Sequence, residues 1–187
     1  MPAIQFSSHR GPARRSIALA VALAFCLALV ACSTTGGRQP VTPMRVDAGR
    51  AAQLISAYRA QSGLGPVRVD SRLMRVAADY ARTMGERDRI RHGIGGSLPR
   101  RVAAAGYDWG YAAENLAASY SGLEDAMQGW KASAGHRRNL LGPYATEIGI
   151  AAVATPAGSD HRNYWALVLA APKPERLVAR TVALDTQ

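Results

Sequence analysis

"TEIGIAAVA" (146–154) and "NYWALVLAA" (163–171) decide the fold of this 187-residue chain. Both stretches are rich in apolar, β-branched and aromatic residues, and the segment between them, "TPAGSDHR" (155–162), consists largely of turn-forming residues. The pattern predicts an antiparallel hairpin. Because nearly every position is apolar, rather than every second one, both faces of the sheet should be covered. A third short strand around "AENLAAS" (113–119) would complete a small sheet.

Helices with apolar stripes are expected to supply the covering layers. Asp47 can cap a helix over residues 48–61. Asp70 or Ser71 can cap a second helix, whose apolar residues recur at helical spacing as far as Met84. Helices first and a hairpin last predict an α+β fold, in which a small antiparallel sheet is the middle layer of an α-β-α sandwich.

Two further helices are predicted between the second helix and the hairpin. A short one is expected over Leu98–Ala105. Ser121 and Glu124 have the spacing of a capping box and would start the next helix. Gly135 is predicted to end that helix, which would place His136 just beyond its end.

The first 31 residues have the pattern of an export signal. Met1–Arg15 contains three arginines and no acidic residue, and Ile17–Ala31 is an uninterrupted apolar run of 15 residues. Such a run is short for a bilayer span of about 20 residues, and its length is typical of a signal peptide. A buried core helix is the alternative, but the run has no amphipathic face. We therefore predict a signal peptide over 1–31.

The cysteine that ends "LVAC" (29–32) indicates lipidation. The stretch resembles the bacterial lipobox, in which small residues precede a cysteine that is acylated and becomes the first residue of the mature chain. Cys26 lies inside the apolar run and is the poorer candidate. We predict attachment to the membrane through lipidated Cys32, hence an exported protein anchored in the cell envelope, at an outer membrane if the cell has one. Ordinary secretion with cleavage nearby is the alternative.

The chain therefore divides into four parts. A signal peptide (1–31) precedes a lipidated cysteine and flexible tether (32–46) of small, polar and proline-rich composition. The folded domain spans 47–172, and a C-terminal tail (173–187) follows. Within the tail, residues 177–184 could add an edge strand, which the pattern does not decide.

The charge of the chain gives a weak signal. Without the predicted signal peptide, 20 Lys and Arg residues stand against 13 Asp and Glu residues, for a net charge of +7. An exported, anchored protein rarely meets nucleic acid, so we expect no nucleic-acid partner. Attraction to anionic lipid headgroups or cell-wall polymers is reasonable, but the charge is scattered along the chain.

Four motifs in a fixed order carry a family resemblance. They are "RHG" (91–93), "AENLA" (113–117), "WKASAGHRRNLL" (130–141) and "EIGIA" (147–151). Their order and spacing resemble the CAP superfamily, also called SCP-like, in its short bacterial form. The resemblance covers roughly Asp47–Pro172 and implies the same α-β-α sandwich.

The resemblance also implies a ligand-binding cleft. In the family, two histidines and two acidic residues line a large cleft, and the matching positions here are His92, Glu114 and His136. The fourth position, a glutamate in many eukaryotic members, is Ser133, so one carboxylate is missing. Asn115 follows Glu114 and is expected to brace a loop of the same cleft.

Two imidazoles and one carboxylate allow three kinds of chemistry. His92, Glu114 and His136 could hold a divalent ion such as Zn²⁺. Glu114 could instead orient a histidine as a general base, with Ser133 as its partner. The third possibility is a hydrogen-bonded network that catalyses nothing. Because CAP proteins are associated with lipid and sterol binding, the favoured expectation is a non-catalytic module that binds a lipid, a sterol-like molecule or another envelope ligand; the alternative is a metal-dependent hydrolase acting on envelope polymer or peptide.

Overall fold

The computed structural model describes residues 38–174, and every element in them belongs to one compact unit that begins at Arg38. The predicted signal peptide, Cys32 and the possible edge strand at 177–184 lie outside the described residues. None of the helices in the described part is both long and apolar enough to pass through a bilayer.

The helices and strands are β1 (Thr42–Met44), α2 (Ala48–Ala60), β2 (Arg68–Val69), α3 (Ser71–Glu86), α4 (Leu98–Ala104), β3 (Trp109–Ala118), α5 (Leu123–Ala132), α6 (Ala134–Leu140), β4 (Glu147–Ala154) and β5 (Asn163–Pro172). The four predicted helices and three predicted strands occur in the expected order, and the structure adds β1, β2 and α6.

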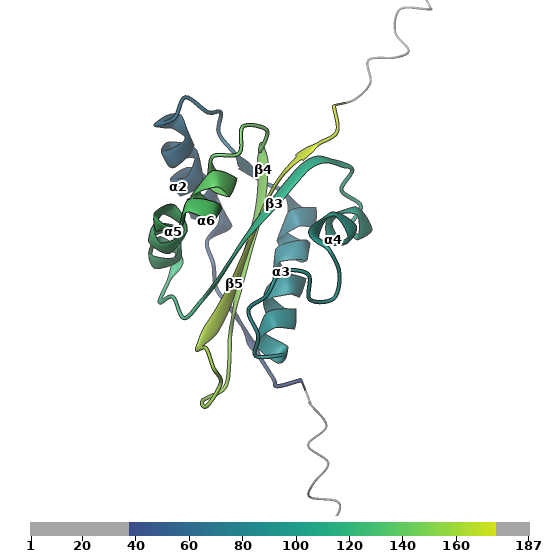
Figure 1. Ribbon diagram of the computed structural model, residues 1–187, viewed down its shortest axis with the longest axis vertical. Helices are drawn as coiled ribbons and strands as arrows, with labels where there is room; N and C mark the ends of the chain where they lie inside the picture. Colours follow the sequence, from purple (N-terminus) through teal and green to yellow (C-terminus); the bar gives the residue numbers. More distant parts are fainter. Residues whose placement is uncertain (1–37, 175–187) are drawn as a thin grey trace, which may run out of the picture. The chain divides into compact units, whose positions relative to one another are not determined.

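The sheet is small and open, with strand order β1-β4-β5-β3. The predicted hairpin is confirmed, since β4 and β5 pair antiparallel with Ala151 opposite Ala166. Strand β3 pairs antiparallel with the other side of β5 and forms an edge of the sheet. The short strand β2 pairs parallel with β4. Figure 1 shows α2, α5 and α6 on one face of the sheet and α3 and α4 on the other, which is the predicted three-layer arrangement.

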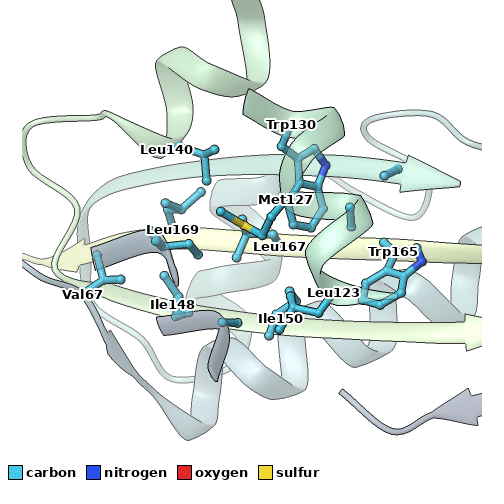
Figure 2. Close-up of a cluster of buried hydrophobic side chains, with 14 of the residues drawn as sticks. Val67, Leu123, Met127, Trp130, Leu140, Ile148, Ile150, Trp165, Leu167 and Leu169 are labelled. Carbon is cyan, nitrogen blue, oxygen red and sulfur yellow. The ribbon is translucent and has the colours of Figure 1, made fainter. Parts of the chain in front are cut away.

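Two apolar cores, one on each face, account for the continuous apolar character of the strands. In β5, Trp165, Leu167 and Leu169 pack with residues of α2, α5 and α6. The alternate residues of the same strand, such as Tyr164 and Val168, pack against α3 and α4. Figure 2 shows the first of these cores, in which side chains from the helices lie over the strands. Side chains buried on both faces are what a sheet covered on both sides requires.

Helix α3 lies unusually close to the sheet. An ideal Cβ atom placed on Gly149 of β4 would lie 2.0 Å from the carbonyl carbon of Leu73. No side chain fits between the two backbones, so glycine is required at this position. Close packing here fixes α3, and with it the loop that follows the helix, against the sheet.

A buried arginine joins α2 to the segment after α6. The guanidinium of Arg59 donates to the carbonyl oxygens of Gly65 at 2.8 Å, Leu140 at 2.9 Å, Gly142 at 2.8 Å and Ala145 at 2.9 Å. Arg59 is 1% exposed. The four bonds satisfy carbonyl groups at the end of α6 and in the loops around it, and they hold α6 in place.

The helix starts are partly as predicted. Asp47 caps α2 by accepting from the backbone N–H of Arg50, and Asp70 caps α3. The predicted capping box of Ser121 and Glu124 is wrong. The N–H and the hydroxyl of Ser121 both donate to the carboxylate of Asp125, at 2.9 and 3.0 Å.

The predicted helix end at Gly135 is also wrong. Helix α5 ends at Ala132, and Ser133 has an extended backbone (φ −80°, ψ 123°) that serves both as the end of α5 and as the N-cap of α6. Gly135 lies in the first turn of α6. His136 therefore projects from the start of a second short helix and does not follow a helix end.

The N-terminal boundary differs from the expected one. Part of the predicted tether (32–46) forms strand β1, in which Thr42 pairs with Ala154 of β4. Val41 packs against the core on the α3 face. The backbone N–H and C=O groups along the outer edge of β4 need hydrogen-bond partners, and β1 supplies them. The polar, proline-rich composition of residues 32–46 does not indicate this pairing, because its cause lies in a distant strand. The ordered domain thus begins before Asp47.

Candidate functional site

The candidate site lies around β3, the edge strand, because two adjacent residues of that strand point to opposite faces of the sheet. Glu114 lies on the same side as Leu116, which packs against α3 and α4. Asn115 points to the other face and contacts α6. Residues of both helical layers therefore meet at this edge.

Glu114 is a buried carboxylate with both oxygens engaged. Its side chain is 7% exposed. One oxygen lies 2.8 Å from Nδ1 of His92, in the loop after α3, and the other accepts from Nη2 of Arg101 in α4 at 2.6 Å. Because a carboxylate only accepts hydrogen bonds, Nδ1 of His92 is the donor in this contact, and Nε2 is an acceptor when the imidazole is neutral. The side chain of His92 is 63% exposed, so this nitrogen is accessible to a ligand.

Arg101 was not singled out in the sequence, although it contributes as much to the site as the predicted residues. Its Nε donates to the carbonyl of Gly96 at 3.2 Å, and its guanidinium lies 3.6 Å above the ring of Tyr80. The remaining nitrogen, Nη1, is buried and has no hydrogen-bond partner among residues 38–174. The sequence shows two consecutive arginines in a short helix, and only packing distinguishes the half-buried Arg101 from the exposed Arg100.

Tyr80 holds the loop that carries His92. Its hydroxyl donates to the carbonyl of Arg91 at 2.6 Å and accepts from the N–H of Ile94 at 3.1 Å. Burial raises the pKa of the Tyr80 hydroxyl, so it stays protonated and remains a donor. The backbone on both sides of His92 is thereby tied to α3.

His136 approaches the same edge from α6. Burial, and to a lesser extent the charge of His92, lower the pKa of its imidazole, so His136 is neutral at pH 7. The fully buried Asn115 donates to the His136 carbonyl at 3.0 Å, and Asn139 donates to Asn115 Oδ1 at 2.9 Å and to the Glu114 carbonyl at 3.1 Å. Asn115 thus braces α6 against β3 and does not face a ligand. Ser133 caps α6 by position only, without a capping hydrogen bond from its side chain.

As arranged, the predicted ligands do not fit a metal ion. Within residues 38–174, no three His, Cys, Asp or Glu side chains are grouped so that they could hold one. In addition, His92 and the Arg101 guanidinium each hold one of the two oxygens of Glu114. A cation could reach this carboxylate only if the guanidinium moved away. The expectation of a Zn²⁺ site formed by His92, Glu114 and His136 therefore finds no support in this geometry.

An apolar hollow of about 250 Å³ lies at the opposite edge of the sheet from Glu114. It is enclosed by β1, β4 and the outer face of α3, and its lining includes Met44, Met74, Ala78 and Ile150. The sequence motifs predicted ligand binding in the histidine cleft alone. This second hollow was not foreseen, because part of its lining comes from the segment that was expected to be a tether.

The chain resembles bacterial proteins both in sequence and in structure. It is 29% identical over 103 residues to YkwD of Bacillus subtilis, covering 54% of this chain and 40% of that protein. It is 31% identical over 113 residues to the membrane protein YlbC of the same organism, covering 59% of this chain and 31% of that one. The match thus spans less than half the length of either relative.

Two solved structures share the fold. One is an extracellular protein containing an SCP domain from Bacillus anthracis, with a TM-score of 0.56 and 24% identity, covering 65% of this chain and 39% of that one. The other is an outer surface protein from Borrelia burgdorferi, with a TM-score of 0.59 and 22% identity, covering 71% of this chain and 100% of that one. The model of the cysteine-rich secretory protein family (CAP) matches residues 52–169. With this match over most of its length, and with the α-β-α fold of its structural neighbours, the chain belongs to the CAP family.

Proposed function

We propose that this protein is exported, anchored to the membrane through lipidated Cys32, and acts as a non-catalytic binding module for a lipid, sterol-like or other ligand of the cell envelope. The apolar run Ile17–Ala31 and the lipobox-like end at Cys32 support export and anchoring. Two similarities agree with this location: one relative is named a membrane protein, and one structural neighbour is named an outer surface protein.

The engagement of Glu114 supports one part of the proposal, namely that this carboxylate is not itself the general base or a metal ligand. His92 lies on one of its oxygens and Arg101 on the other, and a cation would have to approach beside the guanidinium charge. Separating a buried carboxylate from its arginine costs about 3–5 kcal/mol. Glu114 therefore serves as a fixed acceptor that sets the orientation and the tautomer of His92.

The site offers uncharged hydrogen-bonding groups to a ligand. His92 presents Nε2 as an acceptor, and the imidazole of His136 is neutral because burial lowers its pKa. When His92 is neutral as well, the two imidazoles suit a hydroxyl-bearing head group, which can donate to one ring and accept from the other. The apolar hollow at the other sheet edge is a separate place where the apolar part of an amphipathic molecule could bind.

Mass spectrometry of the protein after incubation with a bacterial envelope lipid extract tests the proposal. Residues 33–187 are used, since they contain every described element and lack the acylated cysteine. We expect bound lipid species on the wild type and their loss from His92→Gln/His136→Gln. His161→Gln, in the hairpin loop, is the matched control and should bind as the wild type does.

A further variant tests which part of the surface holds the ligand. Ala78 is exposed on α3 and lines the apolar hollow, so Ala78→Trp should fill the hollow without disturbing the core. If Ala78→Trp loses binding and His92→Gln/His136→Gln retains it, the ligand binds in the apolar hollow and not at the histidines. A wild-type protein that emerges empty from the extract would contradict the proposed binding function.

A further inference from the structure

A hollow lined by three arginines lies in the loop between α3 and α4. Arg87, Arg89 and Arg91 form its walls together with the backbone of Gly93 and Gly95, and its volume is about 320 Å³. All three arginine residues are exposed to solvent. The candidate site at Glu114 does not use any of them.

These arginines have no acidic partner in the described part of the chain. Several other arginines pair with carboxylates, namely Arg38, Arg50, Arg68, Arg72, Arg82 and Arg101. No such ion pair involves the three arginines of the hollow within residues 38–174. The acidic residues next to them in sequence are engaged elsewhere. Glu86 pairs with two arginines outside the hollow.

The other neighbouring carboxylate, Asp88, points toward the hairpin. It accepts from the hydroxyl of Tyr164 at 2.9 Å and from the N–H of Asp160 at 2.8 Å. These hydrogen bonds lower the pKa of Asp88 against the opposing effect of burial. The positive charge of the hollow is thus left without an internal counter-charge.

The backbone that carries the three arginines is fixed. The N–H groups of Asp88 and Arg89 donate to the last turn of α3, at 3.1 and 3.0 Å. Tyr80 holds the carbonyl of Arg91, as described above. Gly93 and Gly95 both have a φ of +78°, and the space where a Cβ would lie is open at each. The three arginines therefore line an accessible cavity on a backbone that is held by hydrogen bonds, which reduces the entropy cost of binding.

We propose that this hollow binds a phosphate group, carried either by the headgroup of an anionic phospholipid or by a free phosphate compound. Guanidinium groups match the geometry of phosphate oxygens and can donate two hydrogen bonds each. Ile90, which is 40% exposed, lies between Arg89 and Arg91 in the chain. An exposed isoleucine flanked by arginines suits the boundary between headgroups and acyl chains.

Two binding measurements on residues 33–187 distinguish the sources of phosphate. One is calorimetric titration with inorganic phosphate, and the other is co-sedimentation with vesicles of phosphatidylcholine alone or mixed with phosphatidylglycerol. The test variant is Arg87→Gln/Arg89→Gln/Arg91→Gln. Its matched control is Arg45→Gln/Arg100→Gln/Arg138→Gln, which removes the same charge from exposed arginines in the loop after β1, in α4 and in α6.

We expect the test variant to lose affinity for anionic vesicles by about 100-fold, about a factor of five for each arginine. The control should lose less than about threefold, since distant charges are screened by salt. Ile90→Ser should weaken vesicle binding and leave any phosphate titration unchanged if the source is a lipid headgroup. Binding of phosphate without binding of vesicles would assign the site to a free phosphate compound.

Two results would overturn the proposal. One is a wild-type protein that binds neither inorganic phosphate nor anionic vesicles. The other is an equal loss in the test and control variants, which would show that net charge alone is responsible. Neither result bears on the binding function proposed for His92 and His136, because the two sets of residues are separate.

Discussion

At the scale of single residues, the site depends on one buried carboxylate and its two partners. Glu114 accepts a hydrogen bond from His92 on one oxygen and a hydrogen bond from Arg101 on the other. The three groups come from different parts of the fold: His92 from a loop, Arg101 from a helix and Glu114 from the edge strand. The arrangement converts a glutamate, which could have been a base, into a structural acceptor that orients an imidazole.

Replacing Arg101 by methionine should destabilise the protein by about 3 kcal/mol, because it leaves the buried Glu114 without its cationic partner. Urea unfolding monitored by circular dichroism measures the change. The double variant Arg101→Met/Glu114→Gln should recover part of the loss. Arg100→Met, on the exposed side of the same helix, is the control and should change stability by less than about 0.5 kcal/mol. If Arg101→Met and Arg100→Met are equally stable, the ion pair between Arg101 and Glu114 does not stabilise the fold.

The imidazole of His136 should titrate below its ordinary pKa of 6.5, because burial and the charge of His92 both disfavour its protonation. The NMR shift of its ring protons against pH measures this. His92→Gln should raise the pKa of His136 by removing the charge that His92 carries when it is protonated, whereas His161→Gln should leave it unchanged. A His136 pKa at or above 6.5 would contradict the buried, neutral state.

The same shift has a consequence for stability. Above about pH 6.5 neither the folded nor the unfolded chain binds a proton at His136, so the residue contributes no pH dependence. As the pH falls below that value, the unfolded chain takes up the proton more readily than the folded chain, and stability decreases until the folded pKa is also passed. The variant His136→Gln should lose less stability on acidification than the wild type.

At the scale of helices and strands, local patterns predicted the elements well and their ends less well. The hairpin, α3 and the caps at Asp47 and Asp70 follow from apolar periodicity and from residues a few positions apart, which are local causes. The break between α5 and α6 was missed. A glycine near a helix end resembles a helix stop, whereas the backbone turns at Ser133, two residues earlier.

Long-range contacts explain the other differences from the sequence prediction. Arg59 lies on the buried face of α2 because four backbone carbonyls from later segments need a donor. Arg101 lies in the site because Glu114 needs a counter-charge. Strand β1 forms because β4 has an open edge. The motif resemblance placed His92 and Glu114 together correctly, but no spacing rule could have shown that an arginine would occupy the second oxygen.

Two glycine substitutions test the packing of these elements. Gly149→Ala should cost about 3 kcal/mol or more, because its Cβ would lie 2.0 Å from the backbone of Leu73 in α3. Gly135→Ala is the matched control: no atom lies within 4 Å of its ideal Cβ, and it sits in a helix. It should stabilise the protein by roughly 0.5–1 kcal/mol. Denaturant unfolding measures the change in stability of both variants. If Gly135→Ala is destabilised, the result would favour the helix end at Gly135 that the sequence predicted.

At the scale of the whole molecule, the proposals describe a protein held close to a membrane. In the sequence, five residues separate Cys32 from Arg38, the first residue that the structure describes. Such a linker spans at most about 20 Å. The domain would then work within reach of the headgroups, where a phosphate-binding hollow and a ligand-binding surface are both useful.

Metabolic labelling with an alkyne fatty acid tests the anchor in cells that express the full chain. The two cysteines, Cys26 and Cys32, provide a matched pair of variants. The wild type and Cys26→Ala should carry the label and remain in the membrane fraction, whereas Cys32→Ala should carry none, because the thiol that is acylated has been removed. Label on Cys32→Ala would contradict lipidation at this residue.

The most direct test of the central claim is a crystal structure of residues 33–187 grown or soaked with Zn²⁺. The claim is that Glu114 is a structural acceptor, held by His92 and Arg101, and does not bind a metal ion. We predict that His92 Nδ1 and the Arg101 guanidinium remain on the two oxygens of Glu114, with no zinc ion between His92 and His136. A zinc ion held by His92, Glu114 and His136, with Arg101 displaced, would contradict it.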